Sequence, residues 1–263
     1  MKIATWNVNS IRTRLDLVTQ WLQATAVDVL CLQETKVTDA DFPQAPFVEL
    51  GYHCYVYGQK SYNGVALISR APLDRVNTGF APVVDVAEPD LDQQKRVIQG
   101  VLGEVCLVNL YVPNGSAVGS EKYDYKLRWL KQLRLYLQAL LSSYPNLLVC
   151  GDFNVALDDR DIHDPSGREQ MVMATDAERT ALTHALLELG LADGFRKFHL
   201  DGGHFSWWDY RAAAFRRNLG WRIDHHYLSA PLYERAIACT IDVAPRQLPQ
   251  PSDHTPVIIE LED

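Results

Sequence analysis

The stretch that decides the fold is Asn146-Leu147-Leu148-Val149-Cys150-Gly151-Asp152-Phe153-Asn154. Its first half is a short apolar run, which is typical of a buried strand when turn residues bound it. Gly, Asp and Asn favour turns, so the strand predicted over 146–151 ends where the polar side chains begin. On its own, this pattern fits either a simple turn or chemical groups held at the end of a rigid strand.

Polar residues lie at the ends of several other predicted strands in the same way. They follow or end strands over 2–8, 27–33 and 105–110, and they lie at or before the start of strands over 222–229 and 256–261. Because strand ends in a packed sheet are rigid, side chains from several strands can converge there. The set comprises Asn7, Glu34, Tyr111, Asn114, Asp152, Asn154, Asp224, Asp253 and His254.

The rest of the chain mixes helices and strand pairs. Ser10 is a candidate N-cap for a helix through Leu15, an apolar stripe predicts a helix over 122–143, and a capping box at 175–178 opens a helix that Gly190 ends. Further strands are predicted at about 52–57, 63–69, 96–112 with a break near 100–104, 204–207 and 236–243. The economical arrangement is an α/β (α+β) fold with two packed β-sheets flanked by helices, in one domain spanning residues 1–263.

Composition indicates an ordinary globular protein with a large core. The chain has 263 residues, of which 47% are apolar, and no stretch approaches the roughly 18 apolar residues of a membrane-spanning helix. Its five cysteines are scattered without a CxxC pair, which favours free thiols in a reducing cytosol over zinc or disulfides. The first seven residues lack the apolar region of a signal peptide, so we expect a cytoplasmic location.

The formal net charge of −8 argues against a protein that coats nucleic acid by overall attraction. Basic runs at 122–134 and 196–222 depart from this balance, although such runs usually only solvate a surface. A nuclease remains compatible with the charge, because metal sites need acids and local patches can contact phosphates.

Each polar residue also has a structural interpretation. Glu34 could leave its sheet into solvent, Asp224 could be an exposed charge, and His254 could be a satisfied histidine of the core. The adjacent His225 and His226 suggest a metal site, but successive strand residues face opposite sides of a sheet. We therefore interpret both histidines as packing or surface residues.

An ordered set of motifs resembles the exonuclease III family of apurinic/apyrimidinic endonucleases, within the endonuclease/exonuclease/phosphatase superfamily. The motifs occur in the family's order and cover essentially the whole chain. They are Trp6-Asn7-Val8-Asn9, Leu32-Gln33-Glu34-Thr35-Lys36, Asn63-Gly64-Val65-Ala66, Asn109-Leu110-Tyr111-Val112-Pro113-Asn114, Gly151-Asp152-Phe153-Asn154, Trp221-Arg222-Ile223-Asp224 and Ser252-Asp253-His254. The resemblance implies a four-layer α/β sandwich of the deoxyribonuclease I-like type.

The resemblance also implies metal-dependent attack of water on a phosphodiester. Glu34 would hold a Mg²⁺ ion, with Asp253 and Asn7 helping to hold or orient it, and Mn²⁺ could substitute. Asp152 would orient and deprotonate the attacking water, and Asn154 would fix the geometry. A second ion, if one acts, would use Asp152 and Asn154.

The remaining residues of the set would contact phosphate. His254 would donate a hydrogen bond to the scissile phosphate, while Asp224 would set its tautomer and favour its charged form. Tyr111 would contact the phosphate or assist the leaving oxygen, and Asn114 and Lys36 would contact the phosphate or the backbone near it. The metal would neutralise charge that builds in the transition state.

The aromatic and basic segment 205–211 matches the part of the family that accepts an extruded abasic sugar. Trp207 with Trp221 would form the pocket, because an aromatic wall can exclude an intact base by size. One of the adjacent residues Trp207 and Trp208 is expected to lie in the core instead. Arg211 would hold DNA phosphates.

The function that follows is a DNA repair nuclease acting on double-stranded DNA as a monomer. It would cut 5′ to an abasic site, leave a 3′-hydroxyl, clear blocked 3′ ends and act as a 3′→5′ exonuclease. The alternatives are a phosphatase of inositol phosphates, an RNA deadenylase and a catalytically inactive DNA-binding scaffold. Residues 157–174 vary in the family and receive no catalytic role, and Asn9 stands where some members carry an aspartate, which leaves the metal coordination open.

Overall fold

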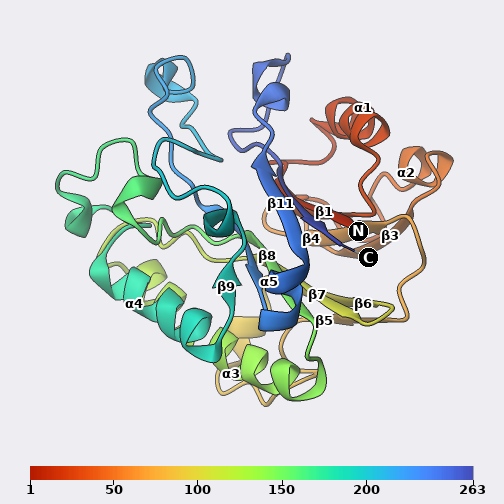
Figure 1. The fold of residues 1–263 in the computed structure, drawn as a ribbon, viewed down its shortest axis with the longest axis horizontal. Helices are drawn as coiled ribbons and strands as arrows, with labels where there is room; N and C mark the ends of the chain where they lie inside the picture. The colour runs from red at the N-terminus through yellow and green to blue at the C-terminus, as the bar shows by residue number, and fades with distance from the viewer. Residues whose placement is uncertain (263) are drawn as a thin grey trace.

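A computed structural model describes residues 1–262 as two six-stranded β-sheets packed face to face, with helices on the outer faces (Figure 1). The strand orders are β11-β12-β1-β2-β4-β3 and β5-β6-β7-β8-β10-β9. The strands are β1 Lys2–Asn7, β2 Val29–Gln33, β3 His53–Tyr57, β4 Val65–Ser69, β5 Arg75–Thr78, β6 Val97–Leu102, β7 Val105–Tyr111, β8 Leu147–Asp152, β9 Ala192–Asp193, β10 Asp224–Leu228, β11 Ala236–Ile241 and β12 Val257–Leu261. The α-helices are α1 Leu15–Thr25, α2 Ala45–Glu49, α3 Glu121–Ser143, α4 Asp176–Ala185 and α5 Ala230–Arg235.

Buried side chains fill three spaces between four layers. One cluster packs α1 and α2 on the first sheet, a second lies between the sheets, and a third packs the second sheet against α3 and α4. In β8, Leu147 and Val149 face the helices, whereas Leu148 and Cys150 face the other sheet. Because alternate strand residues face opposite sides, a strand covered on both faces must be apolar throughout. The predicted fold class, a helix-flanked two-sheet sandwich, is confirmed.

Two parallel strand pairs determine where the polar strand ends meet. β1 pairs with β2 so that Asn7 lies opposite Gln33, and β7 pairs with β8 so that Tyr111 lies opposite Asp152. The carboxyl ends of parallel strands lie at the same edge of a sheet. β10 runs antiparallel to β8, so its first residue, Asp224, also lies opposite Asp152.

The predicted helices are observed, but one cap and one end are wrong. The side chain of Ser120 caps α3, and the Thr175–Glu178 capping box opens α4. The α-helix ends at Ala185 and not at Gly190, because the backbone leaves the helical conformation at Leu186; a separate 3₁₀ turn then ends at Gly190. The prediction that Ser10 caps the first helix is wrong. The helix α1 begins only at Leu15, so Ser10 lies in the loop before it. The Ser10 hydroxyl contacts the hydroxyl of Thr13 in that loop.

The strand predicted over 204–207 is also wrong. Only isolated bridges form there, joining Trp207 to Trp221 and to His254. The segment is otherwise a loop, because its backbone bonds to Trp221 and Thr255 do not extend into a ladder. Within the described residues, no helix is both long and apolar enough to cross a membrane.

Candidate active site

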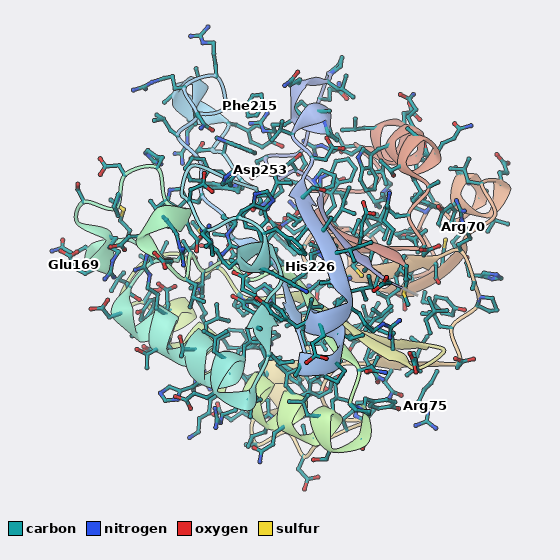
Figure 2. All side chains as sticks on the ribbon, viewed as in Figure 1. Arg70, Arg75, Glu169, Phe215, His226 and Asp253 are labelled. Carbon is teal, nitrogen blue, oxygen red and sulfur yellow. The ribbon has the colours of Figure 1, made fainter. Side chains whose placement is uncertain are left out.

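The polar strand ends of both sheets meet at one edge of the sandwich. Figure 2 places Asp253 at this edge and His226 deeper in the molecule. Asn7, Asp152, Asp224 and His254 are buried there. The predicted convergence of strand ends is therefore observed.

Asn7 links the acids of the two sheets. Its Nδ2 donates to Glu34 Oε1 and to Asp152 Oδ2, both at 2.9 Å, while Tyr111 Oη donates to the same Glu34 oxygen at 2.8 Å. The Asn7 Oδ1 atom accepts the Asn9 backbone N–H at 3.0 Å. Asn7 thus turns its amide nitrogen, not its oxygen, toward the two carboxylates.

The turn after β8 holds Asp152 by its own backbone and side chains. Asn154 donates its backbone N–H to Asp152 Oδ1 at 2.9 Å and its Nδ2 to Asp152 Oδ2 at 3.2 Å. Asn114 Nδ2 in turn donates to Asn154 Oδ1 at 2.9 Å. Gly151 is required before the turn, because its φ is +144° and a Cβ there would lie 2.0 Å from Leu110 O.

Asp224 and His254 form the second half of the site. His254 Nδ1 lies 2.9 Å and 3.1 Å from the two Asp224 oxygens, and the Ser206 hydroxyl donates to Asp224 Oδ2 at 2.6 Å. The other ring nitrogen, Nε2, lies 3.7 Å from Asp152 Oδ2. Burial alone would lower the pKa of His254, but Asp224 and Asp152 outweigh it and raise that pKa to about 10.

The acids of the site differ in electrostatic environment. Burial raises the pKa of Asp152 to about 7, although His254 opposes this shift and Asp224 adds to it. Burial also acts to raise the pKa of Glu34, yet the ammonium of Lys36, 2.8 Å from Oε2, and the amide of Asn7 lower it overall. Glu34 is therefore held ionised, which a cation ligand must be.

Oxygen atoms predominate among the groups that could hold a metal ion. Asp152, Asp224 and His254 lie close enough to share one ion. However, Nδ1 of His254 already faces both Asp224 oxygens, and an imidazolium has no lone pair to offer a metal. Glu34 fits a cation better, because the ammonium of Lys36 already lies against its carboxylate. The same ammonium donates to Asn9 Oδ1 at 2.5 Å. Carboxylate and amide oxygens suit a hard ion such as Mg²⁺.

Asp253 is oriented by two side chains beside the site. Its Oδ1 accepts the Asn9 amide at 3.0 Å, and its Oδ2 accepts Trp207 Nε1 at 3.1 Å. Burial acts to raise the pKa of Asp253, but His254 and these hydrogen bonds lower it overall. Asp253 is thus a second ionised carboxylate at this edge.

Trp207 and Trp221, the two residues predicted to form the aromatic pocket, lie in contact in a small cluster where Trp221 is buried and Trp207 is half-buried. Trp207 and Trp221 meet edge to face, with ring centroids 6.5 Å apart, whereas Trp208 is buried in a separate core cluster. The expectation that one of the adjacent tryptophans is core is confirmed. Arg211 lies apart, with 88% of its side chain exposed and its guanidinium paired to Asp209.

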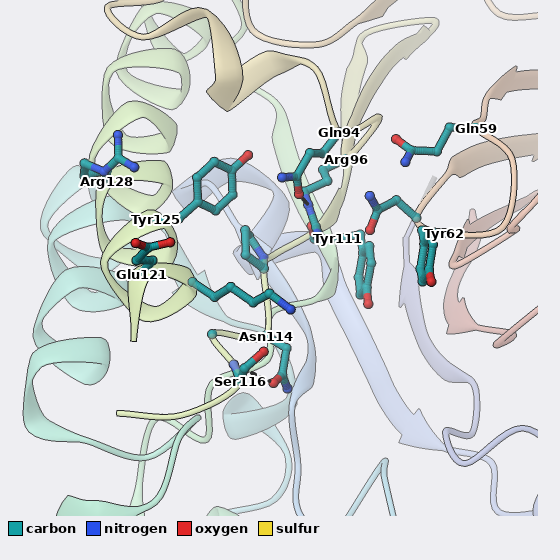
Figure 3. A pocket seen from close by; sticks show the side chains of 14 residues that line it. Gln59, Tyr62, Gln94, Arg96, Tyr111, Asn114, Ser116, Glu121, Tyr125 and Arg128 are labelled. Carbon is teal, nitrogen blue, oxygen red and sulfur yellow. Dashed lines mark hydrogen bonds between the residues drawn. The ribbon is translucent and has the colours of Figure 1, made fainter. Parts of the chain in front are cut away.

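An open pocket of about 580 Å³ extends from Tyr111 and Asn114 along the molecular surface (Figure 3). Figure 3 shows Tyr125 and Arg128 on the helix at one side and Tyr62 at the other. Arg96, Lys122 and Arg128 make its lining basic, although the net charge of the protein is negative. The residues that line the pocket are Gln59, Tyr62, Asn63, Gln94, Arg96, Tyr111, Pro113, Asn114, Gly115, Ser116, Glu121, Lys122, Tyr125 and Arg128.

Sequence reasoning missed three supporting residues. Ser206 holds Asp224, Lys126 donates to the backbone of Asn154, and the Arg96 guanidinium lies 4.6 Å from the centre of the Tyr111 ring. Arg96 and Lys126 stood in the sequence as ordinary basic residues on a strand and a helix. Lys126 lies at helical spacing from Tyr123 and Leu130, on the buried side of α3. Only this spacing could have indicated that its side chain is buried.

His225 and His226 are packing residues, as expected. Both are buried, and each ring nitrogen Nε2 contacts a backbone carbonyl oxygen, that of Val155 for His225 and that of Val257 for His226. Neither lies in the group of possible metal ligands found among the described residues.

Comparison with known proteins supports the resemblance seen in the motifs. Residues 4–254 match the Endonuclease/Exonuclease/phosphatase family. The chain belongs to this family. Exodeoxyribonuclease III of Haemophilus influenzae is 32% identical to the present chain, and the match covers 99% of both proteins.

Two solved structures have the same fold as the present protein over its full length. An AP endonuclease from Archaeoglobus fulgidus is 38% identical with a TM-score of 0.93, and both chains are covered in full. A 3′ phosphatase from Neisseria, solved with a product DNA hairpin, is 38% identical with a TM-score of 0.95 and the same coverage. The expected resemblance to exonuclease III and AP endonucleases is therefore confirmed.

Proposed function

We propose that this protein is a metal-dependent DNA repair nuclease. It cuts the phosphodiester 5′ to an abasic site to leave a 3′-hydroxyl, and it removes blocks and nucleotides from the 3′ ends of duplex DNA. The observation that carries the proposal is the single site in which Asn7 joins Glu34 to Asp152 and His254 faces Asp224. Proteins that are similar over their full length carry the names exodeoxyribonuclease, AP endonuclease and 3′ phosphatase. These names support DNA as the substrate.

In this proposal, Asp152 orients and deprotonates the attacking water. The turn hydrogen bonds from Asn154 fix the carboxylate, and burial brings its pKa to about 7, where a general base works well. Asn154 fixes the position of the same water. Tyr111 lies beside Glu34 and contacts the phosphate or assists the leaving oxygen.

His254 supplies the positive hydrogen-bond donor for the scissile phosphate. Its Nδ1–H is held by Asp224, so Nε2–H is directed into the site near Asp152. A raised pKa keeps the imidazole charged at neutral pH, and a charged donor stabilises a developing oxyanion more strongly than a neutral one.

Glu34 and Asp253 would hold Mg²⁺, with Mn²⁺ as a substitute, while Asn7 orients Glu34 rather than binding the ion through its oxygen. When bound, the ion neutralises charge on the phosphate. Lys36 would move from Glu34 toward the DNA phosphate, since a flexible four-carbon stem allows its ammonium several positions. Asp152 and Asn154 are the candidates for a second ion.

DNA would lie across both sides of the site. Trp207 and Trp221 would accept the abasic sugar, and Asn114 with the basic pocket of Figure 3 would follow the phosphate backbone on the opposite side. The exposed Arg211 adds a further phosphate contact. We further propose that the protein acts as a monomer in the cytoplasm, with the DNA.

A panel of substrates tests this function against the alternatives. The protein should cut a duplex with one abasic site and a duplex with a 3′-phosphate in Mg²⁺ buffer. An inositol phosphate and poly(A) should remain intact under the same conditions. Faster turnover of either one would overturn the proposal, and binding of DNA without cleavage of any substrate would indicate an inactive scaffold.

A further inference from the structure

A lysine and a glutamate without exposed surface lie beneath the amide side of the site. Lys126 on α3 and Glu178 on α4 both have side chains that are 0% exposed, and Nζ lies 2.5 Å from Oε1. Charges are costly to bury unless they are paired and their remaining hydrogen-bonding groups are satisfied, so the partners of this pair decide whether the core can hold it.

The ammonium of Lys126 uses each of its donors. Besides Glu178, it donates to the backbone oxygen of Asn154 at 2.7 Å and to that of Asn114 at 3.2 Å. A lysine ammonium has three N–H groups and no acceptor, so these three partners satisfy it completely.

Both carbonyls belong to the asparagines that reach Asp152. Asn114 Nδ2 donates to Asn154 Oδ1, and Asn154 Nδ2 donates to Asp152 Oδ2. Asn154 also has a φ of +49°, in the left-handed region that costs energy for a non-glycine residue. Its surroundings must therefore hold it in place, and Lys126 is the charged group that does so from below.

Glu178 fixes the lysine from the other side. Its Oε1 accepts the backbone N–H of Met173 at 2.9 Å, and its Oε2 accepts the Thr175 backbone N–H at 3.1 Å and hydroxyl at 2.8 Å. The pair thereby joins α3, the start of α4 and the two asparagine turns at one buried point.

We propose that Lys126, held by Glu178, is a positioning residue that sets the side chains of Asn114 and Asn154 against Asp152. This inference rests on the proposed function, in which Asp152 and Asn154 act on the attacking water. The Lys126 side chain has no exposed surface from which it could contact DNA. It acts through the two backbone carbonyls, so its loss displaces the asparagines and Asp152 rather than removing a reacting group.

The first test separates positioning from stability. Lys126→Met keeps the length of the side chain and removes its donors, while Leu133→Ala opens a cavity in the same helix away from the site. At a temperature well below both melting points, Lys126→Met should lower kcat on an abasic duplex by about 10- to 100-fold with little change in KM. Leu133→Ala should lower Tm and leave kcat unchanged.

The second test asks whether Lys126 acts through Asn154. In an Asn154→Ala background, Lys126→Met should lower kcat less than about threefold, because the residue that it positions is gone. The same fold-loss in both backgrounds, or an unchanged kcat for folded Lys126→Met, overturns the inference. If Lys126→Met does not fold, Lys126→Met/Glu178→Gln leaves no stranded charge and replaces it in both tests. A parent protein that cuts no DNA would instead refute the proposed function.

Discussion

The Nδ2 atom of Asn7 lies 2.9 Å from Oδ2 of Asp152, although the two residues belong to different sheets. The site therefore exists only while the sheets keep their relative position. The apolar cluster between the sheets, which includes Ile3 and Cys150 from the two strands concerned, maintains that position. Catalytic geometry and core packing are coupled at this contact.

Substitution of Asp152 by Asn should nearly abolish cleavage while the protein stays folded. Loss of a general base costs about 10²- to 10⁴-fold in rate. Burial raises the pKa of Asp152 to about 7. Ionisation of this carboxyl therefore destabilises the folded protein, and stability is lost as pH rises through that value. In metal-free buffer at pH 8, the variant should melt at or above the temperature of the parent, as circular dichroism would measure. A variant with the parental rate contradicts the role of Asp152.

Substitution of Glu34 by Gln should raise the Mg²⁺ concentration that gives half-maximal rate. The increase should exceed about tenfold, since even residues that only support a metal ligand contribute 10- to 100-fold to affinity. Glu104→Gln is the matched control, because Glu104 is an exposed acid paired with Arg235 away from the site. Equal Mg²⁺ titrations for the two variants would show that Glu34 does not hold the ion.

Substitution of Arg211 by Ala should weaken DNA binding without changing the chemical step. Loss of one phosphate contact reduces the slope of log K against log salt by about 1. Arg75→Ala is a control on the far side of the molecule, where Figure 2 shows that side chain. Fluorescence anisotropy with an abasic duplex at several salt concentrations measures both slopes. Identical slopes for the two variants would remove Arg211 from the DNA interface.

The buried cluster around Arg222 predicts a pH dependence of stability. Arg222 Nε and Nη2 lie 2.6 Å from Asp161 Oδ1 and Asp193 Oδ2. Burial acts to raise the pKa values of both acids, but Arg222 outweighs it and lowers them overall. Lowered pKa values stabilise the folded protein above the ordinary aspartate pKa of about 4, and this stabilisation is lost as pH falls through the folded values.

Substitution of Arg222 by Met should therefore reduce stability most at neutral pH. Without Arg222, Asp193 loses its arginine partner and Asp161 keeps only Arg196, and breaking a buried ion pair in this way costs about 3–5 kcal/mol at pH 7. Their pKa values should rise, so the deficit relative to the parent shrinks as the pH approaches 4. Urea unfolding at pH 7 and pH 4.5 measures both free energies. A deficit that grows on acidification would contradict the assigned electrostatics.

The sequence predicted the parts of the fold that carry a strong local pattern. The stripe of α3, the capping box of α4 and the apolar run of β8 all have local signals, and each element was found where expected. Edge strands β5 and β9 were not predicted, because strands of four and two residues have too little periodicity to detect. The false strand at 204–207 contains residues that make only isolated bridges, and whether a bridge extends into a ladder depends on distant partners that no local pattern records.

The candidate site was predicted as a set of residues but not as a network. Strand ends indicated Asn7, Asp152 and His254 individually, while their contacts depend on the packing of two sheets, which no local pattern records. The buried role of Lys126 was hidden for the same reason: its Glu178 partner lies 52 residues away. The assigned roles of these residues remain predictions that the substitutions above can decide.

Cleavage of a duplex with one abasic site, with and without EDTA, tests the central claim most directly. In Mg²⁺ buffer, a nick should form 5′ to the abasic site, and its 3′ end should support extension by a DNA polymerase because it is a hydroxyl. EDTA should abolish the reaction, and excess Mg²⁺ should restore it. Undiminished cleavage in EDTA, or a 3′ end that a polymerase cannot extend, would contradict a metal-dependent nuclease of this type.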